Sequence, residues 1–267
     1  MPDRQRLYRT EAIVLRRSDL GEADRLLTLL TPDRGKLRVI AKGARKIASR
    51  KSGHVELFNR VSLLIARGRG DFDIVSQAET IEPSRALRED LTRSTYAHYA
   101  AELIDRFAEE GTAQPELFDL LRNGLGWFSD AADPALTARY FELRLLTLAG
   151  FQPQVFHCAG GGEPLAEIED DGTYGWSPGQ GGALCPRHAA DRTDISRLSL
   201  GALKVIRHAL RSEYQAFVAL QLREPVQNEV ERALQRYLTY VLERKLKSIE
   251  FINLLRREQV SKQIGSK

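Results

Sequence analysis

Hydrophobic and polar positions alternate along the first 80 or so residues with the period of a β-strand. In the segment 35–43, GKLRVIAKG, Leu37, Val39 and Ala41 fall on one face, and most positions of the other face are basic. Turn signals separate this segment from similar ones. We predict four further strands, at residues 7–16, 23–32, 55–67 and 72–80. Five short strands over so short a stretch indicate a small, closed or partly closed β-barrel.

After Pro83 the apolar residues recur with a helical period instead. Ser84 can cap a helix that continues to Gly111, and Asp133 followed by Pro134 fits the start of another that ends at Gly150. Further helices are predicted at 114–130, 199–210 and 225–257. The predicted fold class is multidomain α+β: an N-terminal five-stranded OB-fold barrel followed by a mostly helical domain.

The segment 151–190 interrupts the helices, is rich in Gly and Pro, and contains both cysteines of the chain. We interpret it as a degenerate zinc-knuckle insertion. Four segments are therefore expected: the barrel at 1–82, a first helical part at 83–150, the knuckle at 151–190, and a second helical part at 191–267.

The composition is that of a folded, water-soluble protein. Of 267 residues, 42% are hydrophobic and 28% are charged, which suffices for a core. The chain has neither an apolar run long enough to span a membrane nor the apolar core of a signal peptide, so we expect no membrane partner. Two cysteines do not form a disulfide framework, which favours a reducing cytoplasm.

Charge is distributed unevenly along the chain. Residues 1–70 contain 17 basic and 7 acidic residues, a net charge of +10. The remaining residues contain 23 basic and 29 acidic residues, a net charge of −6. A basic module joined to an acidic one favours a polyanion as the partner of the first.

The basic residues concentrate between 34 and 53, a stretch without any acidic residue. One alternative is a solvated loop; the other, which we favour, is a phosphate-binding surface that binds nucleic acid without reading its sequence. Phe58 and Phe72 are nearby but are interpreted as core, so we expect mainly electrostatic binding that includes duplex DNA. The candidate DNA-binding residues are Arg34, Lys36, Arg38, Lys42, Arg45, Lys46, Arg50 and Lys51.

The cysteines raise the question of a metal. Zinc takes four ligands, and paired C-x-x-C or C-x-x-H turns supply two each. Cys185 and His188 form one such half, whereas Cys158 is followed three residues later by Gly161. His157 adjoins Cys158, but adjacent side chains diverge on an extended chain and bind one ion poorly. We expect a knuckle that folds without metal, with zinc at Cys158, Cys185 and His188 as the alternative.

An enzyme is the rival interpretation, as a metal-dependent nucleic-acid-processing hydrolase with an OB-fold for substrate capture. It requires a carboxylate cluster, and Asp24, Asp33, Asp71 and Asp73 have no distinctive spacing. No phosphate-binding motif of nucleotide hydrolases occurs in the sequence. We therefore expect no catalytic residue. A third interpretation is an RNA-binding OB protein, because nothing in the basic stretch selects against a 2′-hydroxyl.

Four segments of the sequence carry a resemblance to a known family. They are EAIVLRRSDLGEADRLLTLLTPDRGKLRVIAKGARK at 11–46, ELFNRVSLLIARGRGDFDIVSQAE at 56–79, RYFELRLLTLAGFQPQVFHCAGGGEPL at 139–165 and GWSPGQGGALCPRH at 175–188. The chain resembles the RecO family of bacterial recombination mediators over nearly its whole length.

The resemblance implies a non-enzymatic role in the repair of DNA damage and in homologous recombination by the RecF pathway. RecO-like proteins bind single- and double-stranded DNA and anneal complementary strands. With RecR and RecF they help load RecA onto DNA coated by single-stranded DNA-binding protein, whose acidic C-terminal tail they contact. It also implies a cytoplasmic, nucleoid-associated location and a DNA surface on the N-terminal barrel, which coincides with the basic stretch.

The resemblance also bears on the metal. Many members have two C-x-x-C turns and look like zinc binders, whereas others read C-A-G-x-G-E-P, as this chain does. The chain departs from the four-cysteine pattern at Gly161 and His188. The expectation is therefore a decayed zinc knuckle and no cofactor.

Overall fold

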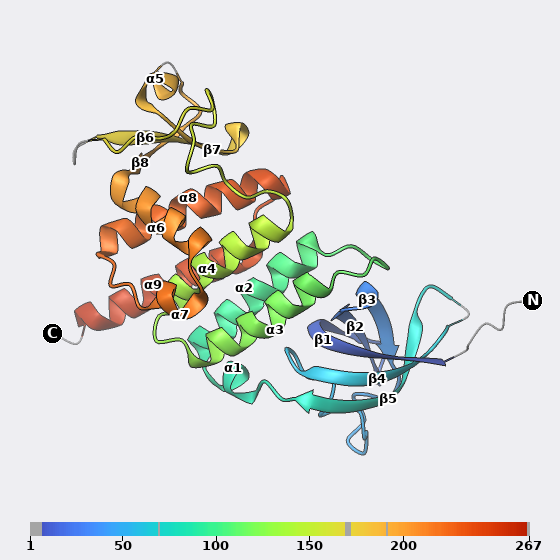
Figure 1. Ribbon diagram of the computed structural model, residues 1–267. Helices are drawn as coiled ribbons and strands as arrows, with labels where there is room; N and C mark the ends of the chain where they lie inside the picture. Colours follow the sequence, from blue (N-terminus) through green and yellow to red (C-terminus); the bar gives the residue numbers. More distant parts are fainter. Residues whose placement is uncertain (1–6, 69, 169–171, 191, 266–267) are drawn as a thin grey trace, which may run out of the picture. The chain divides into compact units, whose positions relative to one another are not determined.

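The computed structural model describes residues 7–68, 70–168, 172–190 and 192–265, with the elements labelled in Figure 1. The chain divides into two compact units, one formed by Met1–Ala131 with Lys247–Lys267 and the other by Ala132–Leu246. This division differs from the four segments expected from the sequence. The first helices and the C-terminal helix belong with the barrel, and the Gly-rich segment belongs with the helices around it.

The first unit begins with five strands that close into a barrel in the order β1-β2-β3-β5-β4. They are β1 (Leu7–Leu20), β2 (Asp24–Thr31), β3 (Gly35–Ala41), β4 (Arg60–Ala66) and β5 (Asp73–Glu82). Long β1 pairs with both β2 and β4, its register shifts between Val14 and Arg16, and β3 pairs in parallel with β5. The prediction of a five-stranded, OB-like N-terminal domain in an α+β protein is confirmed, with strand ends moved by a few residues.

The barrel core consists of the alternate residues that point inward, as the period-two pattern predicts. Val39 and Ala41 of β3 are fully or almost fully buried, whereas Arg38, next to Val39 on the other face, is exposed. The interpretation of Phe58 as core is confirmed, because its side chain is 1% exposed. The buried cluster comprises Ala12, Val14, Leu27, Leu29, Val39, Ala41, Ala44, Val55, Val61, Leu63, Ile65 and Val75.

The helices of the first unit are α1 (Arg85–Glu89), α2 (Leu91–Phe107), α3 (Pro115–Asp130) and α9 (Lys247–Gly265). The single helix predicted from Ser84 to Gly111 is broken, because Asp90 adopts an extended conformation and caps α2 by accepting from the backbone N–H of Arg93. Ser84 does not cap with its side chain; its hydroxyl donates to the carbonyl of Phe58 at 2.9 Å. Helix α2 packs against α1, α3, α9 and β1.

The helices of the second unit are α4 (Pro134–Leu148), α5 (Pro186–Ala189), α6 (Leu200–Arg211), α7 (Tyr214–Val218) and α8 (Glu224–Leu242). Asp133 caps α4 as predicted, accepting from the N–H of Leu136. The predicted helix at 225–257 is two helices instead. Helix α8 ends where Glu243 takes a left-handed conformation (φ 52°), and α9 starts after Leu246.

The Gly-rich segment contributes two strands to a small sheet that the sequence did not predict, and the third strand follows the segment. Strands β6 (Thr173–Ser177), β7 (Gly182–Leu184) and β8 (Ser196–Ser199) pair in the order β7-β6-β8, and a 3₁₀ turn at Pro178–Gln180 links the first two. The sheet is anchored to α8, since the indole N–H of fully buried Trp176 donates to the carbonyl of Ala233 at 2.9 Å. Arg207 of α6 anchors the part of the Gly-rich segment that precedes β6, because its guanidinium donates to the carbonyls of Val155 and Leu165.

Candidate nucleic-acid interface

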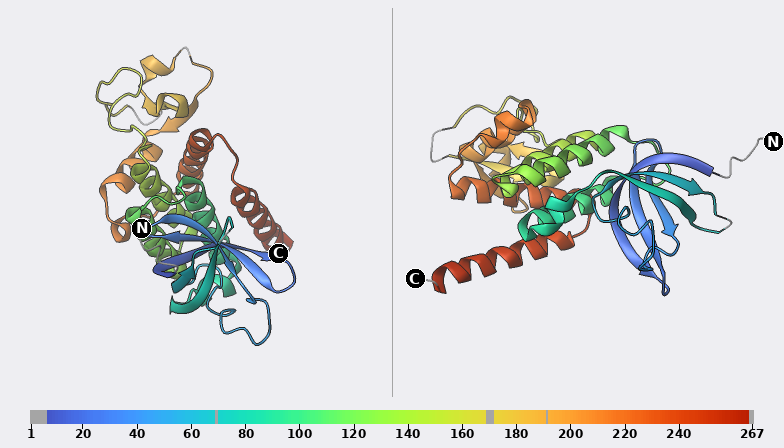
Figure 2. Two further views of the ribbon diagram at one scale, coloured as in Figure 1. Left: turned by 90° about the vertical axis from the view of Figure 1, so that its right-hand side faces the viewer. Right: turned by 90° about the horizontal axis from the view of Figure 1, so that it is seen from below.

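The eight predicted DNA-binding residues lie on β3, just before it, or in the loop from residue 42 to 59 that joins β3 to β4. This loop extends from the barrel in the left view of Figure 2. Its base is fixed by two hydrogen bonds to the β1–β2 connection. The N–H of Gly43 donates to the carboxylate of Asp24 at 2.7 Å, and the N–H of Arg45 donates to the carbonyl of Ala23 at 2.9 Å.

Lys36 is engaged within the first unit and is not free to meet a phosphate. Its ammonium group donates to the backbone carbonyl of Asp105 on α2 at 2.6 Å and lies 3.3 Å from the Asp105 carboxylate. The Lys36 side chain is only 17% exposed. It therefore joins β3 to α2, a structural role that alternation along the strand does not show.

Three arginines have acidic partners but remain accessible. Arg38 lies 3.2 Å from Glu110, Arg45 lies 3.3 Å from Asp19, and Arg34 lies 3.4 Å from Asp33. Surface ion pairs of this kind contribute about 0–1 kcal/mol each, so a phosphate can displace the carboxylate at small cost.

The remaining basic residues differ in exposure. The half-buried Lys51 donates to the carbonyl of Val75 at 3.1 Å. Lys42, Lys46 and Arg50 are exposed, and no carboxylate of the part of the chain that the structure describes lies within 4.0 Å of them. We call these three residues the loop cations. An anchored loop that carries three solvated, uncompensated charges is suited to contact a phosphate backbone.

Two aromatic rings lie beside Arg34 and Arg38, and both rings were missed or misjudged from the sequence. The guanidinium of Arg34 lies 4.4 Å from the centre of the Tyr8 ring on β1, and that of Arg38 lies 5.5 Å from the centre of the Phe72 ring. The interpretation of Phe72 as core is wrong, because its side chain is partly exposed next to Arg38. For Tyr8, the one signal in the sequence was its place on the predicted first strand of the barrel. Rings and guanidinium groups together form a surface on which bases can stack.

Tyr8 is held in place by Asp73. Its hydroxyl donates to the Asp73 carboxylate at 2.8 Å. Burial, with this hydrogen bond adding to it, raises the pKa of Tyr8 above its ordinary value. The ring therefore stays neutral at physiological pH and does not repel a phosphate.

The carboxylates considered for a nuclease are not gathered. Asp24 binds the N–H of Gly43, Asp33 accepts from the Thr10 hydroxyl, and Asp73 accepts from Tyr8 and from the N–H of Gly68. Within the described ranges, one group of three or more metal-ligating side chains occurs, and it lies in the second unit. It contains a single carboxylate, which is not the composition of a carboxylate-based nuclease centre.

That group contains all three predicted metal ligands. Donor atoms of Cys158, Cys185 and His188 lie within 4.8 Å of one another, and Glu163 joins them. His157 is exposed and is not a member. Glu163 was not identified from the sequence because it is five residues from Cys158, outside the C-x-x-C spacing.

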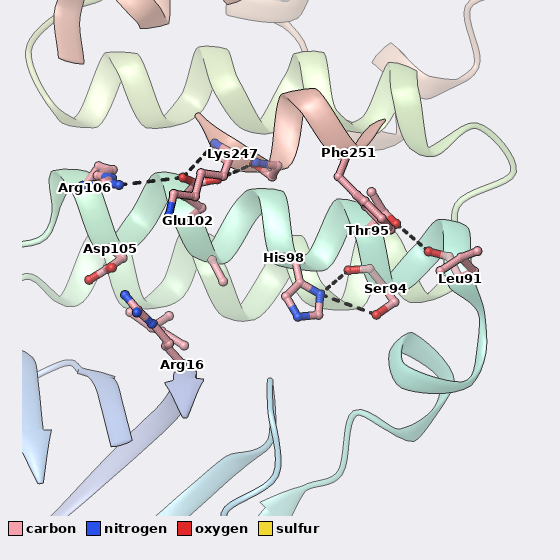
Figure 3. Close-up of a pocket in the computed structure, with 13 residues that line it drawn as sticks. Arg16, Leu91, Ser94, Thr95, His98, Glu102, Asp105, Arg106, Lys247 and Phe251 are labelled. Atoms are coloured by element: carbon pink, nitrogen blue, oxygen red, sulfur yellow. Dashed lines mark hydrogen bonds and ion pairs between the residues drawn. The ribbon is translucent and has the colours of Figure 1, made fainter. Parts of the chain in front are cut away.

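A groove of about 690 Å³ lies between β1, α2 and α9 within the first unit (Figure 3). Leu91 and Phe251, 61% and 45% exposed, give it apolar walls, and Arg16 and Asp105 give it charges of both signs. Glu102 closes one side by accepting from the backbone N–H groups of Lys247 and Ser248, at 3.1 and 2.9 Å. Because its lining carries charges of both signs, the groove does not favour a ligand of either charge.

Glu102 is ionised in this position. Burial opposes its ionisation, but hydrogen bonds from Ser248 and Lys247 outweigh burial and lower the pKa of Glu102 below its ordinary value. A carboxylate at a helix N-terminus also interacts favourably with the helix dipole. Glu102 thus holds the first turn of α9 against α2.

Across the residues that the structure describes, no helix has the length and apolar character needed to cross a membrane.

Comparisons with known proteins agree with the fold. Residues 5–84 match the family model for the Recombination protein O N terminal, and residues 88–250 match that for the Recombination protein O C terminal. A protein of Roseiflexus sp. (strain RS-1), named DNA repair protein RecO, is 42% identical over 255 residues, which cover 95% of this chain and 88% of that protein.

Two further relatives carry the same name. The protein of Desulforudis audaxviator is 40% identical over 92% of this chain and 96% of its own length. That of Symbiobacterium thermophilum is 36% identical over 94% of this chain and 98% of its own length. With both terminal family models matched and relatives at 36–42% identity over almost its whole length, the chain belongs to the RecO family of DNA repair proteins.

Proposed function

We propose that this chain is a non-enzymatic mediator of recombinational DNA repair that binds single- and double-stranded DNA and anneals complementary strands. With RecR, and with RecF indirectly, it helps load RecA onto DNA coated by single-stranded DNA-binding protein. Membership of the RecO family supports the role in repair. The loop cations, exposed on an anchored loop of the barrel, are the observation that carries the proposal for DNA.

The charge pattern fits annealing. Two complementary strands repel each other through their phosphates, and a cationic surface that neutralises phosphates lowers this repulsion without a covalent step. The loop cations supply charge that no carboxylate of the described residues offsets, and Arg38 can exchange Glu110 for a phosphate. Because backbone contacts dominate, the surface is expected to accept duplex as well as single strands.

The aromatic rings add a preference for single strands. Bases of a single strand can stack on the partly exposed Phe72, next to Arg38, whereas bases of a duplex are already stacked on each other. This arrangement supports tighter binding of single strands at equal phosphate contact.

Protein partners are proposed from the family resemblance alone. They are RecR and the acidic C-terminal tail of the single-stranded DNA-binding protein. A tethered tail would raise the local concentration of the barrel near coated DNA. We assign the chain to the cytoplasm, with the DNA, and name no residues for either partner.

The test is annealing of two complementary oligonucleotides coated with the cognate single-stranded DNA-binding protein. Wild type is compared with the triple variant Lys42→Ala, Lys46→Ala, Arg50→Ala, and with a control triple variant of equal charge change on the second unit. The control replaces Arg192, Arg197 and Arg223, which are also exposed, by Ala.

Annealing by wild type and by the control without nucleotide or divalent metal, and its loss in the loop-cation variant, is the expected result. Strand cleavage that requires added divalent metal, or annealing that the loop-cation substitutions leave unchanged, would contradict the proposal.

A further inference from the structure

We propose that Cys158, Glu163, Cys185 and His188 bind one zinc ion, with Glu163 supplying the ligand that a cysteine at position 161 does not. This replaces the metal-free knuckle expected from the sequence. The donor atoms come from two loops of the second unit: Cys158 and Glu163 from the Gly-rich turn, and Cys185 and His188 from the start of α5.

The spacing of the donor atoms is close to that of a tetrahedral site. Bond lengths of about 2.0–2.3 Å to N, O and S imply edges of roughly 3.3–3.8 Å between ligand atoms. The Nδ1 atom of His188 lies 3.4 Å from the Cys158 sulfur and 3.2 Å from the Cys185 sulfur. The Oε1 atom of Glu163 lies 3.1 Å from the Cys185 sulfur and 3.2 Å from His188 Nδ1. Small outward shifts admit an ion at the centre.

Hydrogen bonding alone does not explain this gathering. Nδ1 of His188 has either one hydrogen or one lone pair in the ring plane, so it can form one good hydrogen bond. Three atoms nevertheless approach it within 3.4 Å: two sulfurs and a carboxylate oxygen. A cation shared by all four donor atoms satisfies them together.

Position 161 shows how Glu163 takes the vacant ligand position. A Cβ atom built on Gly161 would lie 2.1 Å from Oε2 of Glu163 and 2.4 Å from Cε1 of His188. A cysteine at 161 and the present Glu163 side chain therefore compete for one space. The absence of the second cysteine in this turn leaves room for a carboxylate, so the site keeps four donors.

The backbone holds both loops in register. The N–H of Cys158 donates to the carbonyl of Glu163 at 2.7 Å, and the N–H of Gly162 donates to the carbonyl of Cys158 at 2.7 Å. The N–H of Cys185 donates to the Cys158 sulfur at 3.3 Å, which links the two loops. Amide donors to sulfur stabilise the thiolate that a metal requires. Such outer contacts orient the ligands of a metal site.

The donor set identifies the kind of metal. Two sulfurs, one imidazole and one carboxylate suit zinc, which accepts S, N and O ligands in a tetrahedron. Magnesium and calcium require six or more oxygen ligands, which this cluster does not provide. Zinc is thus the ion that the residues fit.

The experiment uses cobalt(II) as a spectroscopic probe of the full-length protein freed of metal by a chelator under reducing conditions. Cobalt in a tetrahedral site with thiolates absorbs in the visible range, and zinc then displaces it, which gives the zinc affinity. Wild type is compared with Glu163→Ala and Glu163→Gln. The control is Glu167→Ala, which removes an exposed carboxylate of the same segment that pairs with Lys204.

We expect one equivalent of metal for wild type and for Glu167→Ala, with the tetrahedral spectrum. Both Glu163 variants are expected to lose at least roughly 10–100-fold in zinc affinity, by comparison with even outer-shell changes at metal sites, and to show an altered spectrum. The far-ultraviolet circular dichroism of each variant establishes that it is folded. Absence of cobalt binding by wild type would overturn the site, and unchanged affinity and spectrum in folded Glu163 variants would overturn the role of Glu163.

Discussion

The ammonium group of Lys36 lies 2.6 Å from the backbone carbonyl of Asp105 and 3.3 Å from the carboxylate of the same residue. A residue near the start of the predicted DNA-binding stretch thereby connects strand β3 to helix α2. The basic stretch divides into residues that support the fold, such as Lys36, and residues that are free to meet DNA, such as the loop cations.

Replacing Lys36 by Met should destabilise the first unit by about 1–3 kcal/mol, because the substitution removes a charge-assisted hydrogen bond and leaves the Asp105 carbonyl without this donor. Urea denaturation followed by Trp127 fluorescence, in a background where Trp176 of the second unit is replaced by Phe, measures the change. Lys42→Met, which removes an exposed lysine, is the control and should change stability by less than about 0.5 kcal/mol. Equal stabilities for the two variants would show that the Lys36 contact is not structural.

Acid should release α9 from α2 through Glu102. The pKa of Glu102 is lowered below its ordinary value of 4.5. Its contribution to stability is therefore fully present above that ordinary value and is lost as the pH falls through the lowered pKa of the folded state. Hydrogen-exchange protection factors of the backbone amides at 249–256, measured at several pH values from about 7 down to about 3, follow the loss.

In Glu102→Gln the same amides should be less protected near neutral pH, with a smaller change on acidification. The pH dependence of protection that comes from residue 102 is then absent, since glutamine does not titrate. Protection that falls equally with acid in wild type and in Glu102→Gln would assign the pH dependence to another group.

The second unit contains a buried ion pair that should be costly to break. Arg139 and Glu142 on α4 lie 2.7 Å apart and are 2% and 0% exposed, and Glu231 of α8 lies 3.8 Å from the same arginine. Glu142→Ala should cost about 3–5 kcal/mol, because it leaves a buried guanidinium with less compensation. Trp176 fluorescence during urea denaturation, in a Trp127→Phe background, reports on this unit.

The matched control for that measurement is Glu167→Ala, which breaks the exposed pair with Lys204 and should cost less than about 1 kcal/mol. A cost for Glu142→Ala that is no larger than the control's would mean that the buried pair adds no stability.

The sequence predicts the barrel well where a strand such as β4 or β3 buries mainly one face. Val39 and Ala41 are buried and Arg38 is exposed, so the period of two appears directly in the residue types. Helix boundaries depend on single capping events instead. Asp90 ends one helix and starts another, a break that the continuous apolar period from Leu87 to Leu103 conceals.

The sequence predicts only part of the candidate interface, because the contacts of its basic residues depend on the fold. The number of basic residues is visible, but their partners are far away along the chain, as with Lys36 and Asp105 or Arg38 and Glu110. Glu163 escaped notice because its approach to Cys185 depends on the path of a Gly-rich turn. Contacts between residues that are far apart along the chain become visible only in the folded structure.

The most direct test of the account is the salt dependence of DNA affinity. The dissociation constant for a single-stranded oligonucleotide is measured at several salt concentrations for wild type, for the loop-cation triple variant and for the control triple variant of the second unit. If Lys42, Lys46 and Arg50 each contact a phosphate, the slope of log affinity against log salt should become shallower by about 2 in the loop-cation variant, at roughly 0.7 per contact. The control should keep the wild-type slope. A loop-cation variant with the wild-type slope, or a control with the shallower one, would place the DNA-binding surface elsewhere on the protein.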